Sequence, residues 1–310
     1  MKIVIIGSGA MGSLFAGFLA KAKEDVWLLD NNPQRAEKIS EEGIKSQGVS
    51  GSWQVKVKMT TDPKEIGPAD LIIIAVKSYH TKEAIKNIES IVAESTMILT
   101  LQNGLGNIEV ISEVFGPERV IGGITNQGAT LLKIANIKHA GTGETIIGRI
   151  DGKIPVGLRS LRETFNKAGI ETRISKDIKA LIWSKLIINV GINALTAITR
   201  LPNGKLLEFE GTRKIMEQAV SEAVRVAKRK RIKLIYDDPL AKVEAVCQAT
   251  AANISSMLQD VQKKKHTEID FINGVIVRQA QSLGLAAPVN TMLTNLVKTI
   301  EASYNNVVAC

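Results

Sequence analysis

The residues near the start of the chain that could do chemistry form the pattern Gly7-x-Gly9-x-x-Gly12. Gly7 permits a tight turn, Gly9 lets the backbone approach a pyrophosphate, and Gly12 lets a helix pack close to a strand. The pattern follows a β-branched run at residues 2–6 and opens a segment of helical periodicity, which is the context that dinucleotide binding requires. The alternative is a structural turn without a ligand. The predicted cofactor turn comprises Gly7, Ser8, Gly9, Ala10, Met11 and Gly12.

Asp30 closes the second predicted strand, at residues 26–29, and bears on the choice of cofactor. A carboxylate there accepts hydrogen bonds from both ribose hydroxyls of NAD and repels the 2′-phosphate of NADP. NADH is therefore the favoured form of NAD(P)H. Arg35 and Lys38 are nearby cations that weaken this inference, although we expect Arg35 to swing into solvent and both to be ordinary exposed charges on the following helix.

A second constellation recurs every four residues as Lys185, Asn189 and Asn193, within a segment that is otherwise apolar nearly all round. On a helix these three side chains form one slanting polar stripe. Burial of a lysine and two amides is costly unless they have partners, and a polar ligand is an attractive partner. The alternative is a polar seam between helices that neighbouring side chains satisfy.

Further candidates follow predicted strands of the first half. Asn103 comes after the apolar run at residues 97–101, and Lys77 comes after the run at residues 71–76. The carboxyl ends of parallel strands are where ligands bind in such folds. The ordinary explanation for Asn103 and the glycine after it is a turn, because both residues tolerate positive φ.

The second half offers Asn253, Ser256 and Glu268. Asn253 and Ser256 are one helical turn apart, so they can face the same way. Glu268 falls where a helix is expected to start. On the residues alone, the stronger explanation for Glu268 is a first-turn acid favoured by the helix dipole.

Residues 1–175 alternate apolar strands with helical segments, which predicts an α/β Rossmann domain with a doubly wound, mostly parallel sheet. The expected helices are at 81–92 and 156–168, and short strands at 120–124 and 144–148 are expected to be added to the sheet, with antiparallel pairing open. Residues 176–310 show mainly 3.6-residue periodicity, which predicts an all-α domain. Its expected helices are 176–200, 212–231, 239–262, 268–283 and 288–305.

Composition narrows the class of protein. The 310 residues are 45% hydrophobic and 23% charged, as in globular proteins, and no apolar run is long enough to cross a bilayer. No secretory signal is recognised, so we expect a cytoplasmic protein. Two cysteines, Cys247 and Cys310, and three histidines argue against a disulfide framework or a metal cluster.

The net charge of +9 by itself allows nucleic acid, a membrane surface or small anions as partners. Dense basic runs occur at 228–231 and 263–265, and aromatic residues make up 4% of the chain, so little is available for base stacking. We therefore expect neither nucleic acid nor membrane as a partner. The surplus charge suits anionic substrates and nucleotide phosphates.

Taken together, the motifs of both halves resemble the ketopantoate reductase (2-dehydropantoate 2-reductase) family. They are Gly7-Ser8-Gly9-Ala10-Met11-Gly12, Ala75-Val76-Lys77, Gln102-Asn103-Gly104, Trp183-Ser184-Lys185-Leu186 with Asn189, Asn193-Ala194-Leu195-Thr196, and Asn253-Ile254-Ser255-Ser256-Met257-Leu258-Gln259-Asp260 through His266-Thr267-Glu268-Ile269-Asp270. The second-half motifs are the more specific, because unrelated dinucleotide enzymes share the glycine turn. One departure is that many members carry an arginine beside the second strand end, where this chain has Asp30-Asn31.

The resemblance implies reduction of ketopantoate, a small 2-oxo acid, to (R)-pantoate by NAD(P)H, on the way to pantothenate and coenzyme A. It makes Lys185 the general acid and Glu268 its partner in the catalytic site. The implied substrate residues are Asn103, Asn189, Asn193, Asn253 and Ser256. The implied cofactor residues are the glycine turn, Asp30, Lys77, Asn103 and Glu268.

Two other functions remain open. A related two-domain dehydrogenase could act on another 2-oxo or 3-hydroxy acid, because one scaffold hosts many substrates. A non-catalytic NAD(H) sensor could use the helical half as a partner surface, but such a protein has no reason to bury Lys185 and two asparagines in line. The sequence leaves the oligomeric state open, a homodimer included.

Overall fold

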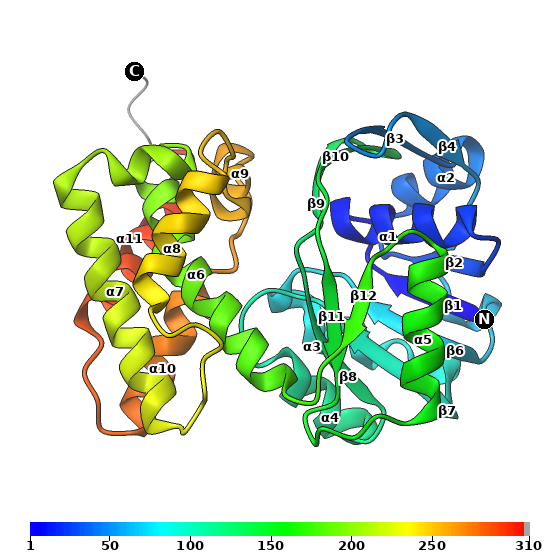
Figure 1. Ribbon diagram of the computed structural model, residues 1–310. Coiled ribbons are helices and arrows are strands. Elements are labelled where there is room, and N and C mark those ends of the chain that lie inside the picture. Colours follow the sequence, from blue (N-terminus) through cyan, green and yellow to red (C-terminus); the bar gives the residue numbers. More distant parts are fainter. Residues whose placement is uncertain (307–310) are drawn as a thin grey trace. The chain divides into compact units, whose positions relative to one another are not determined.

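The computed structural model describes residues 1–306, which form two compact units (Figure 1). Unit 1 contains residues Met1–Gln102 and Gly106–Ile178. Unit 2 contains Asn103–Leu105 and the chain from Lys179 onward. Cys310 lies outside the described residues.

Unit 1 is built on an eight-stranded sheet with the order β12-β11-β8-β7-β6-β1-β2-β5. All neighbouring strands in it are parallel except β8 and β11, which pair antiparallel. A parallel sheet is covered on both faces, so its strands need apolar side chains on both sides. The apolar runs of the central strands meet this need. The strands are β1 (Lys2–Ile6), β2 (Asp25–Leu29), β5 (Lys58–Thr60), β6 (Ala69–Ile74), β7 (Val92–Thr100), β8 (Val120–Thr125), β11 (Thr145–Gly148) and β12 (Thr172–Ile174).

Helices cover both faces of this sheet, so unit 1 has two apolar cores (Figure 1). Phe15 of α1 and Phe165 of α5 belong to one core, and Ile85 of α3 and Ile111 of α4 belong to the other. The predicted doubly wound α/β class is confirmed. The helices are α1 (Ala10–Lys21), α2 (Pro33–Glu42), α3 (Thr81–Lys86), α4 (Asn107–Phe115) and α5 (Val156–Lys167), with 3₁₀ turns η1 (Pro63–Glu65), η2 (Ser78–His80) and η3 (Glu89–Ile91).

A second, four-stranded sheet with the order β4-β3-β10-β9 packs against α1. A side chain at Gly17 of α1 would collide with the indole of Trp53, since an added Cβ would lie 2.3 Å from its ring. The sequence did not predict this sheet. Its strands are β3 (Ile44–Gly48), β4 (Trp53–Val55), β9 (Gly128–Lys133) and β10 (Asn136–Gly141).

One helix of unit 1 is shorter than expected. The helix expected at residues 81–92 ends at Lys86, η3 follows it, and β7 begins at Val92. Ile88 and Ile91 pack in the same core as Ile85 of α3 and Ile111 of α4. This packing favours the turn over a longer helix.

Unit 2 is all-α, as predicted, and has its own apolar core. Its helix α6 has the length and apolar composition of a membrane-spanning helix, with a mean hydropathy of 1.6 in its most apolar stretch. Since 72% of that stretch is buried inside the structure, α6 is a core helix. The helices are α6 (Ile178–Thr199), α7 (Glu210–Arg229), α8 (Pro239–Ala249), α9 (Ser256–Gln262), α10 (Asn273–Ser282) and α11 (Pro288–Ala302), with 3₁₀ turns η4 (Asn203–Leu207) and η5 (Ile269–Phe271).

Two expected helices of this unit are interrupted. The helix expected at 239–262 is two helices, α8 and α9, because the residues between them pair with η4. The backbone amide of Asn203 donates to the Asn253 carbonyl, and that of Gly204 donates to the Ala251 carbonyl. The helix expected at 268–283 begins as η5, and α10 starts only at Asn273.

Candidate active site

The glycine turn of unit 1 leaves open space beside its backbone, where a ligand could approach. Gly7 adopts a φ of +101°, and a Cβ there would lie 2.9 Å from Val76 Cγ1. A Cβ at Gly12 would lie 2.0 Å from the Gly7 carbonyl oxygen, whereas a Cβ at Gly9 would meet nothing within 4 Å. Helix α1 begins directly after Gly9 and has no acidic residue in its own first turn to oppose the positive end of its dipole.

Asp30 is tied to this turn by its carboxylate. Oδ2 accepts hydrogen bonds from the Ser8 amide at 2.8 Å and the Ser8 hydroxyl at 2.6 Å, and Oδ1 accepts one from the Asn32 amide at 3.1 Å. Burial favours the neutral acid, but the Ser8 hydrogen bonds and the charge of Arg35 outweigh it and hold the pKa of Asp30 below its ordinary value. Asp30 therefore stays ionised and fixes Ser8.

Arg35 does not swing into solvent, contrary to our expectation. Its Nη1 lies 3.1 Å from Asp30 Oδ2 in an ion pair. The reason is local, because Asn32 caps α2 through the Arg35 amide at 3.1 Å, and this cap places Arg35 in the first helical turn beside the end of β2. Lys38 is partly exposed and lies 3.6 Å from Glu42 Oε1.

Lys77 follows β6 at the carboxyl edge of the sheet and is partly buried. The Ala75 amide donates to the Ile6 carbonyl, which holds this loop beside the glycine turn. Gln102, which the sequence placed in a motif without a role of its own, donates from Nε2 to the Val76 carbonyl at 2.7 Å and to the Thr81 hydroxyl at 2.8 Å. Gln102 thus holds the peptide that precedes Lys77.

In unit 2, Lys185 and Glu268 form an interacting pair of opposite charges. Lys185 is partly buried on α6, and Glu268 precedes η5 with 6% of its surface exposed. Burial lowers the pKa of Lys185 to about 8, although the charge of Glu268 acts in the opposite direction. Glu268 directly precedes η5, and its side chain makes no capping hydrogen bond to that turn.

Asn189 and Asn193 continue the stripe one and two turns beyond Lys185. Asn193 is buried and Asn189 is partly buried. No hydrogen bond joins either side-chain amide to another residue within 1–306. In the described part of the chain, neighbouring side chains therefore do not satisfy these two amides as a polar seam between helices would require.

Asn253 and Ser256 are not one helical turn apart. Asn253 lies in the loop before α9, which begins at Ser256, and both residues are exposed. The helix is capped by Ser255, whose Oγ accepts from the Leu258 amide at 3.1 Å. The same hydroxyl lies 2.6 Å from the Thr196 hydroxyl of α6. The sequence analysis missed this contact, although serine at an N-cap is a recognisable signal.

Asn103 belongs to unit 2. The Leu105 amide donates to the Phe271 carbonyl at 3.1 Å, and Gly104 has a φ of +85°, with a Cβ there only 2.2 Å from the same carbonyl oxygen. Phe271 ends η5, the turn that begins directly after Glu268. Asn103 is therefore held against the segment that carries Glu268.

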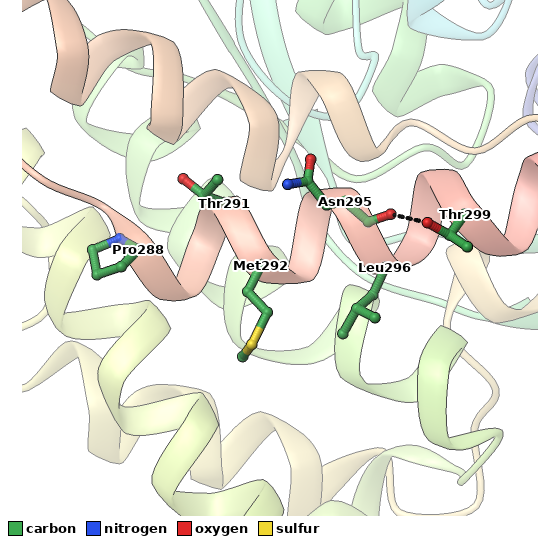
Figure 2. Close-up of a pocket in the computed structure, with 6 residues that line it drawn as sticks. All are labelled: Pro288, Thr291, Met292, Asn295, Leu296 and Thr299. Atoms are coloured by element: carbon green, nitrogen blue, oxygen red, sulfur yellow. Dashed lines mark hydrogen bonds between the residues drawn. The ribbon is translucent and has the colours of Figure 1, made fainter.

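Two surface cavities lie elsewhere. One, of about 480 Å³, lies along α11. Figure 2 shows its lining residues, among which Met292 and Leu296 point to the same side. The other, of about 760 Å³, lies between α5 and β12. Neither is lined by a predicted site residue. Among residues 1–306, no group of three His, Cys, Asp or Glu side chains is arranged to hold a metal ion.

Both halves of the chain match the models of one known protein family. Residues 3–152 match the family described as ketopantoate reductase PanE/ApbA, and residues 177–301 match its C-terminal counterpart. The 2-dehydropantoate 2-reductase of Pyrococcus abyssi is 39% identical over 302 residues, covering 97% of this chain and 98% of that protein.

Two solved structures are similar over nearly the whole chain. A PanE/ApbA family ketopantoate reductase from Ralstonia eutropha has a TM-score of 0.92 and 32% identity, covering 99% of this chain and 100% of that one. A D-mandelate dehydrogenase with NADH and anilino(oxo)acetate has a TM-score of 0.91 and 28% identity, covering 98% and 99%. On the matches to both family regions and the relative at 39% identity, this chain belongs to the ketopantoate reductase family of oxidoreductases.

Proposed function

We propose that this chain reduces 2-dehydropantoate to (R)-pantoate in the cytoplasm, on the route to pantothenate and coenzyme A. The observation that carries the proposal is the stripe on α6, in which Lys185 interacts with Glu268 and is followed by two amides that no residue of 1–306 satisfies. A small 2-oxo acid offers the carboxylate and carbonyl oxygens that such donors need. The names of relatives at 31–39% identity support the same substrate.

The residues of unit 1 fit a nicotinamide dinucleotide. Gly9 leaves space beside the backbone, and the start of α1 supplies N–H groups for a pyrophosphate. When bound, the cofactor supplies the hydride that reduces the ketone carbon. The proposed role of Lys77 is on the cofactor side of the reaction, and the Gln102 hydrogen bond to the Val76 carbonyl, one residue before it, supports this role.

Lys185 is the proposed general acid. A pKa of about 8 leaves the ammonium mostly protonated at neutral pH, yet makes it a better proton donor than a solvated lysine. Its Nζ would hold a proton for the ketone oxygen, on which negative charge develops as the carbon is reduced. Glu268 keeps that proton in place by raising the pKa of Lys185 against the effect of burial.

The remaining polar residues would orient the substrate. Asn189 and Asn193 present amide donors on the face of α6 that carries Lys185. Asn103 is held near Glu268 by the Leu105 to Phe271 hydrogen bond, and Asn253 and Ser256 are exposed at the start of α9. The proposed substrate residues are Asn103, Asn189, Asn193, Asn253 and Ser256.

The first experiment is to add ketopantoate to the purified protein with NADH or NADPH and to follow loss of the reduced-cofactor absorbance. Stoichiometric formation of pantoate supports the proposal. Absence of turnover with both cofactors, in a protein that binds either of them, would refute it.

We further propose NADH as the preferred cofactor. The Arg35 guanidinium is already paired with Asp30 at the end of β2, so a 2′-phosphate would have to compete with that carboxylate. Asp30 Oδ1 accepts one hydrogen bond in the structure, from Asn32, and retains a lone pair for a ribose hydroxyl. Asn31 and Asn32 add no positive charge.

The test compares kcat/KM for NADH and NADPH at fixed ketopantoate. Wild type should favour NADH, and Asp30→Asn should move the ratio towards NADPH because it frees Arg35. Asp25→Asn is the matched control, since Asp25 is also on β2 and also pairs with a cation, Lys58, at 2.8 Å. A tenfold wild-type preference for NADPH, about 1.4 kcal/mol, would overturn the proposal.

A second candidate is reduction of an aromatic 2-oxo acid, favoured by the similarity to D-mandelate dehydrogenase. The same assay with phenylglyoxylate, the 2-oxo acid that corresponds to mandelate, separates the two. A kcat/KM at least tenfold higher for ketopantoate supports the first candidate, and the reverse ratio supports the second.

A further inference from the structure

A buried chain of hydrogen bonds links α6 to the loop before α9. The Leu258 amide donates to Ser255 Oγ at 3.1 Å, Ser255 Oγ lies 2.6 Å from Thr196 Oγ1, and Thr196 Oγ1 donates to the Asn193 carbonyl at 2.9 Å. Thr196 is fully buried and Ser255 is 8% exposed.

The direction of these hydrogen bonds follows from counting their protons. Each hydroxyl carries one proton. Because the Thr196 proton is directed to the Asn193 carbonyl, Ser255 must donate to Thr196, and Ser255 then accepts from Leu258. Every donor in the chain is used, and hydrogen bonds aligned in this way strengthen one another in a buried environment.

This series of hydrogen bonds joins two sets of proposed substrate residues. One end is the backbone of Asn193 on α6, and the other is Ser255, which lies between Asn253 and Ser256. We call residues 253–256 the substrate loop. Its start is also held by η4, because the Asn203 amide donates to the Asn253 carbonyl, but that bond does not connect the loop to α6.

We propose that Thr196 and Ser255 are positioning residues that set the substrate loop at a fixed distance from the Asn189–Asn193 stripe, and thereby determine affinity for the 2-oxo acid. The proposal rests on the proposed function and adds to it two residues that would not touch the substrate. The Thr196 hydroxyl is not next to Lys185, since Thr196 lies three turns further along α6.

Thr196→Val removes the hydroxyl while keeping a side chain of similar shape. It leaves the Ser255 proton without its acceptor in a buried place, so the loop must shift to find another. The expected result is a rise in KM for the 2-oxo acid on the order of tenfold, the size of one lost hydrogen bond. kcat and KM for NADH should stay within about twofold of wild type, because Lys185 and the glycine turn are unchanged.

Three further variants sharpen the test. Thr196→Ser restores the hydroxyl and should return KM to near the wild-type value. Ser255→Ala combined with Thr196→Val should raise KM no more than Ser255→Ala alone, because both remove the same link. Thr199→Val is the matched control, since Thr199 is also on α6 but its hydroxyl bonds to the Leu195 carbonyl of the same helix.

A second measurement does not depend on turnover. Hydrogen exchange of the amides at residues 253–258 should be faster in Thr196→Val than in Thr199→Val when both are folded. Unchanged exchange and unchanged KM in Thr196→Val would overturn the inference. So would a fall in kcat and a rise in KM for NADH that are as large as the rise in KM for the 2-oxo acid. If wild type reduces no 2-oxo acid, the proposed function fails, whereas the exchange result still decides whether the hydroxyl pair holds the loop.

Discussion

At the scale of single residues, the proposed chemistry depends on one ammonium whose environment acts on it in two directions. Burial on α6 makes Lys185 easier to deprotonate, and the nearby carboxylate of Glu268 makes it harder. A lysine with neither influence would hold its proton too firmly at neutral pH to donate it well. The pair therefore supplies a donor whose acidity is adjusted by burial and by one neighbour.

Removal of this ammonium should affect turnover more than cofactor binding. Lys185→Ala is expected to lower kcat by on the order of a hundredfold or more, the usual scale of general acid catalysis, while the Kd for NADH changes little. Lys179→Ala is the control, because Lys179 is an exposed lysine near the start of the same helix. A folded Lys185→Ala protein with wild-type kcat would remove Lys185 from the mechanism.

The pH dependence of ketone reduction should report the same lysine. The reaction needs protonated Lys185, so kcat/KM should fall as pH rises through about 8. Glu268→Gln removes a charge that raises the pKa of Lys185, so the fall should begin at lower pH in this variant. A breakpoint that stays in place in Glu268→Gln, or moves upward, would contradict the assignment of the breakpoint to this pair.

Side chains that repeat along one helix were predictable from sequence, and those that meet across the fold were not. Lys185, Asn189 and Asn193 stand out because their four-residue period contrasts with an apolar helix. The contact between Thr196 and Ser255 joins residues 59 positions apart, and nothing local to either residue indicates its partner. Arg35 was misjudged for a related reason, because its ion pair depends on the cap of α2.

At the scale of elements, the β1–α1 turn makes different demands on two of its glycines. A Cβ at Gly12 would lie 2.0 Å from the Gly7 carbonyl oxygen, whereas a Cβ at Gly9 has open space. Gly9→Ala should therefore fold with a Tm close to wild type but raise the Kd for NADH, since the space is where the pyrophosphate would approach.

Gly12→Ala should instead lower Tm, because the turn must move apart to admit the methyl group. Thermal unfolding and NADH titration of both variants provide the comparison. If Gly9→Ala binds NADH as tightly as wild type, the open space at Gly9 is not the cofactor path.

Elements with a strong periodic signal were predicted well, and elements defined by their neighbours were missed. The central strands β1, β6 and β7 each contain a continuous apolar run, at residues 3–6, 71–74 and 97–99. Runs of this kind are typical of parallel strands covered on both faces. The four-stranded second sheet has short, partly polar strands whose packing against α1 has no signal in their own sequence. The break between α8 and α9 likewise depends on pairing with η4.

At the scale of the whole molecule, the sequence indicated an α/β half and a helical half, but it did not indicate that three residues of the first half belong with the second. Asn103–Leu105 join unit 2 because Gly104 passes so close to the Phe271 carbonyl that no Cβ fits. This contact links positions more than 160 residues apart in sequence. Such contacts arise only when both parts are folded.

The net charge of +9 is a property of the whole molecule and leads to the last prediction. A positive surplus attracts anionic reactants from a distance, and salt screens this attraction. The screening length falls from about 30 Å at 0.01 M ionic strength to about 3 Å at 1 M. With NADH saturating, kcat/KM for ketopantoate should therefore fall several-fold as NaCl is raised over roughly this range, while kcat changes little. The uncharged lactone of the same 2-oxo acid is the control, because it has the ketone but no carboxylate to be attracted. An equal salt response for acid and lactone would show that salt acts on the protein or on the chemical step, and that the positive surplus does not guide the substrate.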